Sequence, residues 1–185
     1  MGADQGGVSR LRPTGIERYL GVDDVIVTKT DLKGRITYAN DVFCDICAMT
    51  EGELLGQPHN VIRHPEMPRA IFHLLWSTVG RGEEIFAYVV NLAADGAHYW
   101  VLAHVTPSYD AAGRLIGYHS SRRKADPAAV AQVRPVYRRL LEEEARHPRA
   151  SEAAEAGVNL LHAIVAEQGL DYERFVWALT NGVAA

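Results

Sequence analysis

Cysteine is scarce in this chain: its 185 residues include only Cys44 and Cys47, which are separated by two residues. A zinc site on such a pair needs two further ligands at suitable spacing, and none stands out in the sequence. A thioredoxin-like redox pair would follow a strand and open a helix, which matches this position only loosely. Because Val42, Phe43 and Ile46 fall on one helical stripe with Cys47, we expect Cys47 in the core and Cys44 as a flanking thiol.

Long apolar runs and an excess of basic charge are absent as well. No run approaches the ~20 apolar residues that a membrane-spanning helix needs, and the N-terminus lacks the basic and apolar regions of a secretory signal. Gly6 stands where N-myristoylation of Gly2 requires Ser or Thr. These absences predict a cytoplasmic protein. A net charge of −4 without a basic stripe argues against a nucleic-acid partner.

Motifs of catalysis are also missing. The sequence contains no nucleophile elbow, phosphate-binding loop, dinucleotide-binding fingerprint or HExxH zinc motif. The glycines at 113 and 117 belong to a turn and a strand, and do not form a phosphate cradle. We therefore expect a binding or signalling protein and not an enzyme.

What is present predicts an α+β domain with a helical appendage. The apolar fraction of 48% and the charged fraction of 23% are ordinary for a globular protein and supply a core. Two strands come first, several helices follow, and three strands come last. Because strands and helices are grouped and do not alternate, we predict an antiparallel sheet with helices on one side. The expected strands are 25–30, 35–39, 85–92, 97–108 and 115–122, and the clearest expected helix between them is 68–79.

The last third of the chain is predicted to be helical. Asp126 followed by a proline is a typical helix start. An apolar stripe then follows a heptad-like spacing, which favours a homodimer seam. The alternative is that residues 127–185 fold back on their own sheet. The stripe consists of Val130, Val133, Tyr137 and Leu140.

Four short stretches resemble one family. They are 37–41 (TYAND), 56–60 (GQPHN), 62–68 (IRHPEMP) and 95–101 (DGAHYWV). Together with the order of elements, they resemble a PAS domain, and most of all the PAS sensors of aerotaxis receptors, over about residues 22–123. We accordingly divide the chain into three parts: an N-terminal tail and cap (1–21), a PAS sensor domain (22–124) and a C-terminal helical extension (125–185).

The resemblance implies a fold, a cofactor and a role. The fold is a five-stranded antiparallel sheet with a helix packed across its concave face, and FAD is held noncovalently between them. The role is redox or oxygen sensing, in which the flavin's oxidation state changes the surface that a chemoreceptor or kinase complex reads. Two family features are missing: the usual tryptophan after the long helix aligns with 85–87 (IFA), and the usual basic turn aligns with 91–96 (NLAADG).

The loop at 60–68 carries the first candidate ligands. Arg63 suits a pyrophosphate or a ring carbonyl, because its planar fork matches oxygen acceptors. His64 can donate to a flavin or ribose oxygen, and Glu66 can orient either side chain. The alternative is that Arg63 and Glu66 form a surface ion pair while His64 caps the next helix.

Six further residues complete the predicted cofactor site. Large aromatic side chains can form core or cleft wall. On the strand 97–108, Trp100 and His104 share one face and Tyr99 lies on the other, and either face can line the cleft. Two asparagines are candidate polar contacts, although each can have a purely structural role. The six are Asn40, Trp76, Asn91, Tyr99, Trp100 and His104.

Two alternatives to FAD stay open. Haem would need a histidine ligand: His73 lies on the helix 68–79 but opposite its apolar face, which leaves His64 or His104. The second alternative is a PAS interaction module without any cofactor, whose cleft is filled by its own side chains.

Overall fold

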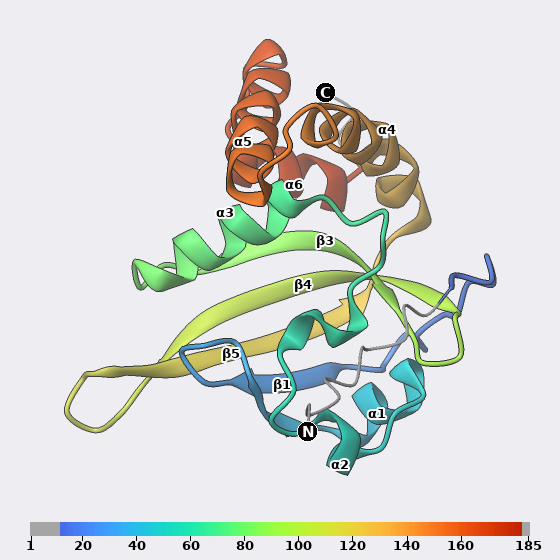
Figure 1. The fold of residues 1–185 in the computed structure, drawn as a ribbon, viewed down its shortest axis with the longest axis vertical. Coiled ribbons are helices and arrows are strands. Elements are labelled where there is room, and N and C mark those ends of the chain that lie inside the picture. The colour runs from blue at the N-terminus through green and yellow to red at the C-terminus, as the bar shows by residue number, and fades with distance from the viewer. Residues whose placement is uncertain (1–11, 183–185) are drawn as a thin grey trace, which may run out of the picture.

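The computed structural model describes residues 12–182, with a five-stranded antiparallel sheet at its centre. The strand order is β2-β1-β5-β4-β3, so the first hairpin joins the last three strands through β1 and β5 (Figure 1). The predicted α+β class and five-stranded sheet are confirmed. The strands are β1 (Ile26–Thr30), β2 (Ile36–Ala39), β3 (Ile85–Leu92), β4 (His98–Tyr109) and β5 (Leu115–Lys124).

Helical elements connect the hairpin to β3. They are α1 (Asp41–Cys47), α2 (Glu51–Leu54), the 3₁₀-helix η1 (His59–Ile62) and α3 (Arg69–Gly80). Local sequence explains the first two starts. The Asn40 side chain accepts from the Phe43 N–H at 3.2 Å and caps α1, and Thr50 and Glu53 form a reciprocal capping box at α2. Cys47 is buried and Cys44 is partly exposed, as expected.

Helix α3 crosses the face of the sheet that we call the inner face. Because strand side chains alternate between faces, every second residue of the long strands points toward α3. Val89 on β3 and Ala103 on β4 are two of these, and both are buried. The space between α3 and this face is the cleft in which a PAS cofactor is expected.

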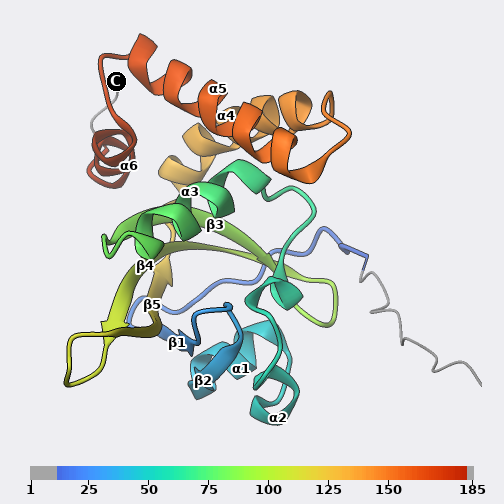
Figure 2. The ribbon, with the colours of Figure 1, turned by 60° about the vertical axis from the view of Figure 1, so that its left-hand side comes forward.

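Three helices follow β5 and fold back on the same chain: α4 (Pro127–Glu144), α5 (Ala150–Glu167) and α6 (Tyr172–Thr180) (Figure 2). They cover β3, which lies at the edge of the sheet. The Tyr137 hydroxyl donates to the Tyr88 carbonyl at 2.5 Å, and the Tyr172 hydroxyl donates to the Phe86 carbonyl at 3.1 Å. Edge strands carry unpaired backbone groups, so these two bonds help to protect β3 from pairing with another chain.

The heptad-like stripe on α4 is therefore not a dimer seam, and that expectation was wrong. Its four residues are buried within this chain, with exposed fractions of 7% or less. An apolar stripe reports only that a helix is covered on one face, and here the cover is the molecule's own sheet and helices. The stripe residues are Val130, Val133, Tyr137 and Leu140.

The beginning of the described chain also packs on the sheet. The backbone N–H of His98 donates to the Ile16 carbonyl at 2.9 Å, and the Arg18 N–H donates to the His98 carbonyl at 2.7 Å. Residues 1–11 of the predicted tail, and 183–185 of the predicted extension, lie outside the described residues. Within residues 12–182, none of the helices has the length and apolar character needed to cross a bilayer. The proposed division at 21/22 and 124/125 stays a prediction.

Candidate functional site

The cleft between α3 and the inner face is narrow and mixed in character. Its cavity volume is about 40 Å³. Apolar side chains from α3 form one wall, and side chains from β1, β3, β4 and β5 form the other. The lining residues are Thr28, Thr30, His59, Phe72, Leu75, Trp76, Val89, Asn91, Ala103, Val105, Tyr118, His119, Ser120 and Arg122.

Four polar atoms of this lining are buried without a hydrogen-bond partner among the described residues. They are Thr30 Oγ1, Asn91 Nδ2, Ser120 Oγ and Arg122 Nη1. Buried polar groups without partners are rare in native proteins, because each one loses its hydrogen bonds to water and gains nothing in return. Four such atoms in one cleft favour a polar ligand that supplies the missing partners.

Arg122 dominates the electrostatics of the cleft. It is 5% exposed and has no carboxylate within ion-pair distance among the described residues. Its Nη2 donates to Thr28 Oγ1 at 3.1 Å and contacts His59 Nε2 at 2.7 Å. The guanidinium carbon of Arg122 lies 5.7 Å from the centre of the Phe43 ring. Burial lowers the pKa of Arg122 to about 10, which keeps it charged at neutral pH. A buried cation without a counter-ion is costly, so the cleft suits an electron-rich or anionic ligand atom.

His59 is held in its neutral form by the same geometry. Because a guanidinium can only donate, His59 Nε2 must accept the hydrogen bond from Arg122 and the ring proton must lie on Nδ1. Removal of the ring from water, and then the charge of Arg122, lower the pKa of His59 well below its ordinary value. The pair therefore presents one positive charge to the cleft and not two.

Of the nine residues predicted as cofactor ligands, Trp76 and Asn91 line the cleft. Trp76 lies at its mouth: the side chain is 37% exposed and meets the Tyr118 ring edge-on, with 5.5 Å between ring centres. Asn91 is buried on the inner face of β3, and its backbone forms a bridge with Arg63. An aromatic ring and an unpartnered amide are thus brought to the same cleft.

The Arg63–His64–Glu66 loop lies against the edge strand, and its side chains are engaged locally. The Arg63 guanidinium donates to the Met67 carbonyl at 2.7 Å and lies 5.3 Å from the Phe72 ring centre. Buried His64 accepts from the Glu66 backbone N–H through Nδ1 at 3.1 Å, and Glu66 itself is exposed. None of the three lines the cleft, and their contact with a cofactor stays a prediction.

The other four candidates are placed by packing. Asn40 joins α1 to β1: its Oδ1 accepts from the Val27 N–H at 2.9 Å, and its Nδ2 donates to the Val25 carbonyl, just before β1, at 2.8 Å. Tyr99 lies on the inner-face side of β4 and is fully buried, with its hydroxyl unpartnered among the described residues. Trp100 and His104 lie on the opposite face, where Trp100 packs 6.0 Å from the Tyr137 ring and His104 bonds Glu84 at 2.7 Å.

Sequence reasoning missed the residues that define the polar part of the cleft. Arg122 stands in a run (HSSRRK) that looks like a solvated basic segment, and His59 precedes the loop that attracted attention. Alternation along β5 offered a clue, because Ser120 and Arg122 share a face with buried Tyr118. The pattern alone does not tell that β5 lies between β1 and β4, where that face becomes buried.

The histidines considered for haem do not meet at the cleft. His73 is exposed on α3, as its helical position predicted. His64 and His104 are absent from the cleft lining, and His104 stacks on Phe86 with 4.1 Å between ring centres. Among residues 12–182 there is no cluster of three or more His, Cys, Asp or Glu side chains that could hold a metal ion.

Comparisons with known proteins identify the fold family. A family model described as the PAS fold matches residues 21–121, more than half of the chain. The chain is 41% identical over 121 residues to the aerotaxis receptor of Escherichia coli (strain K12), covering 65% of this chain and 24% of the receptor. It is 30% identical over 99 residues to a nitrogen fixation regulatory protein of Klebsiella pneumoniae, covering 54% of this chain and 20% of that protein. It thus spans a quarter or less of these relatives.

A solved structure supports the same fold. The light-state structure of the blue-light photoreceptor Aureochrome1 LOV superposes with a TM-score of 0.51 at 22% identity, covering 59% of this chain and 86% of that one. The residues that the family model matches, 21–121, hold α3 and most of the sheet. The chain therefore belongs to the PAS family, and its PAS region resembles that of an aerotaxis receptor.

Proposed function

We propose that this protein is a redox sensor that binds a flavin, FAD according to the resemblance, noncovalently between α3 and the inner face of the sheet. The observation that carries the proposal is the set of four unpartnered buried polar atoms in one cleft. The edge of a flavin ring carries carbonyl oxygens and ring nitrogens that can pair with such groups, while its flat faces suit apolar walls. A bound flavin supplies reversible electron transfer.

Each wall of the cleft has a separate task in this proposal. Arg122 and Asn91 donate to the oxygen-rich edge of the ring, and Arg122 also favours negative charge there. Leu75 and Trp76 of α3 cover the flat face and exclude water. Because the cavity is only about 40 Å³, entry of a tricyclic ring requires the side chains of α3 to move away from the sheet.

Movement of α3 gives the sensor a route to the C-terminal helices. Pro68 provides no side-chain cap for α3. Instead, buried Glu144 at the end of α4 accepts from the Arg69 N–H at 3.0 Å and from the Ala70 N–H at 2.8 Å. A carboxylate at a helix N-terminus is stabilised by the unpaired N–H groups and the helix dipole. In this proposal, a change in flavin charge shifts α3, and the hydrogen bonds to Glu144 transmit that shift directly to α4.

Replacement of Arg122 tests the cleft. We expect Arg122→Met, purified with added FAD, to retain several-fold less flavin per protein than the unaltered chain, because the buried charge that pairs with the ring is lost. Arg123→Met is the matched control, since Arg123 is exposed on the same strand and should retain full flavin. Asn91→Ala gives a second cleft variant should Arg122→Met fold poorly by circular dichroism. Full flavin content in both cleft variants would refute the site.

A PAS interaction module without a cofactor is the second candidate, and the small cavity favours it. In that case the absorption spectrum of the purified chain would lack flavin bands, and added FAD would leave the protein's thermal midpoint unchanged. A haem protein would show a Soret band instead.

We also propose the setting in which the sensor works. The aerotaxis receptor among its relatives supports signalling in the cytoplasm to a chemoreceptor or kinase complex. A homodimer stays part of the proposal, with a surface other than the buried α4 stripe. Size-exclusion chromatography with light scattering measures the oligomeric state.

A further inference from the structure

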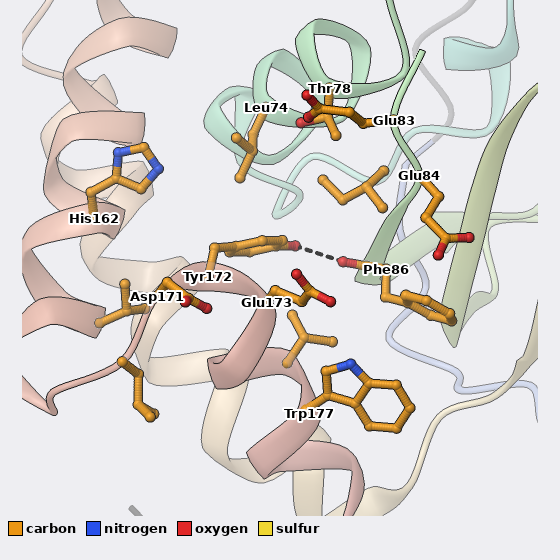
Figure 3. Close-up of a pocket in the computed structure, with 14 residues that line it drawn as sticks. Leu74, Thr78, Glu83, Glu84, Phe86, His162, Asp171, Tyr172, Glu173 and Trp177 are labelled. Carbon is orange, nitrogen blue, oxygen red and sulfur yellow. Dashed lines mark hydrogen bonds between the residues drawn. The ribbon is translucent and has the colours of Figure 1, made fainter. Parts of the chain in front are cut away.

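A second and larger pocket lies outside the PAS cleft, where the C-terminal helices meet α3 and β3. Its cavity volume is about 520 Å³, within the range of small-molecule sites. The wall combines the end of α3 and the start of β3 with residues from α5 and α6 (Figure 3). The PAS core and the helical extension thus both contribute to it.

Aromatic side chains form one side of this pocket. Trp177 on α6 is 50% exposed, and its ring lies 6.0 Å from that of Phe86 on β3. Tyr172 begins α6, and its side chain reaches β3, where its hydroxyl donates to the Phe86 carbonyl (Figure 3). Aliphatic Leu74 and Val176 complete the apolar surface. Half-exposed tryptophan beside a cavity offers a flat face to a ligand.

The charged side chains of the wall are all acidic. Glu83, Glu84, Asp171 and Glu173 line the pocket, and its lining includes no lysine or arginine. Three of these carboxylates have partners outside the lining: Arg81 at 3.0 Å from Glu83, His104 at 2.7 Å from Glu84, and Arg174 at 3.6 Å from Asp171. Within the described residues, Glu173 has no ion-pair partner.

We propose that this pocket binds a small amphipathic organic cation, an amine with an apolar or aromatic body. Carboxylates at the rim attract the cationic group, and the face of an aromatic ring such as Trp177 adds a cation–π contribution. An anionic ligand would meet repulsion, chiefly from Glu173, whose charge no ion-pair partner offsets among the described residues. The volume of about 520 Å³ suits a single small molecule. Such a ligand would contact α3 and α6 together and so bridge sensor and extension.

Three probes that share a phenyl ring and differ in charge test this proposal on the full chain. They are 2-phenylethylammonium, neutral 2-phenylethanol and anionic phenylacetate, titrated while the indole N–H signal of Trp177 is followed by NMR. We expect the ammonium to bind about tenfold more tightly than the alcohol, and phenylacetate to bind more weakly than either. Flavin binding plays no part in this measurement, so its outcome is separate from the proposed sensor function.

Variants separate the charge from the aromatic wall. Glu173→Gln should weaken binding of the ammonium by about threefold and leave binding of the alcohol unchanged. Trp177→Ala should weaken binding of both probes; calorimetry measures the affinities of this variant, which lacks the indole signal. Glu142→Gln is the control, because Glu142 is an exposed carboxylate on α4 outside the lining. The proposal fails if the alcohol binds as tightly as the ammonium, if none of the probes binds, or if Trp177→Ala has no effect. It also fails if only a basic helical peptide binds, since the pocket would then be a protein-docking surface.

Discussion

Within the cleft, the charge of Arg122 and the protonation state of His59 depend on each other. Their 2.7 Å contact requires a neutral imidazole, since His59 must accept from the guanidinium. Protonation of His59 would place two positive charges in contact in a poorly hydrated site, where their repulsion is strong. The acid sensitivity of the fold should therefore depend on this one histidine more than on exposed ones.

A pH series of unfolding measurements tests that expectation. The pKa of His59 is lowered in the folded chain from its ordinary value of 6.5, so the unfolded chain takes up this proton first as the pH falls. The free energy of unfolding should therefore decrease below about pH 6.5, and be fully retained above it. His64 and His119 have lowered pKa values as well, chiefly through burial, and add to the same trend.

Replacing His59 by Gln should flatten this decrease, measured by urea unfolding between about pH 5 and pH 7. His73→Gln, on the exposed face of α3, should follow the unaltered chain. If the free energy of unfolding of His59→Gln falls with pH as steeply as that of the unaltered chain, His59 does not titrate against Arg122.

At the scale of elements, α3 is packed from two sides. Its Phe72 and Leu75 side chains line the cleft, while Ala70 at its N-terminal end meets α5. The contact with α5 is close because Gly157 has no side chain: an added Cβ would lie 2.8 Å from Ala70 Cβ and 3.1 Å from Glu144 Oε1. This glycine therefore allows the junction of α3, α4 and α5.

Gly157→Ala should lower the free energy of unfolding by about 1–3 kcal/mol, because the new methyl group overpacks this junction. Gly80→Ala is the matched control. Gly80 ends α3, and an added Cβ there meets nothing within 4 Å. That substitution should be neutral or stabilise by about 0.5–1 kcal/mol through helix propensity. Equal effects of the two substitutions in denaturant titrations would contradict a close helix junction at Gly157.

At the scale of the whole molecule, the C-terminal helices are part of the packed structure. Tyr137 and Tyr172 bond the edge-strand carbonyls, and Tyr88, at the edge, is 1% exposed. Removal of residues 125–185 would expose this edge and the apolar face of β3.

A chain ending at Lys124 should therefore have a lower thermal midpoint and self-associate more than the full chain, because an uncovered edge strand can pair with a second copy. Light scattering and thermal unfolding measure both effects. Tyr137→Phe, which keeps the helices and loses one buried hydrogen bond, should lower the free energy of unfolding by only about 1 kcal/mol. A truncated chain that is monomeric and equally heat-stable would contradict this role of the helices.

Much of the fold could be predicted from the sequence because its signals are local. The helix start at Asp126 and the β-strands depend on neighbouring residues, and they appear as predicted. The cleft depends on distant pairing. Arg122 and Arg123 lie on opposite faces of β5, and Arg122 is buried because its face is the one that the cleft covers. Likewise, the apolar spacing on α4 shows that one face of the helix is buried. It does not show whether a second chain or the chain's own sheet and helices bury that face.

The flavin content of the purified full chain tests the central claim most directly. After incubation with FAD and removal of the unbound fraction, the absorption spectrum of the protein, together with release of the cofactor by denaturation, gives the ratio of flavin to chain. We predict a ratio near one, and a reversible loss of the visible flavin bands on chemical reduction. A colourless chain that still shows the native circular dichroism spectrum would contradict the account.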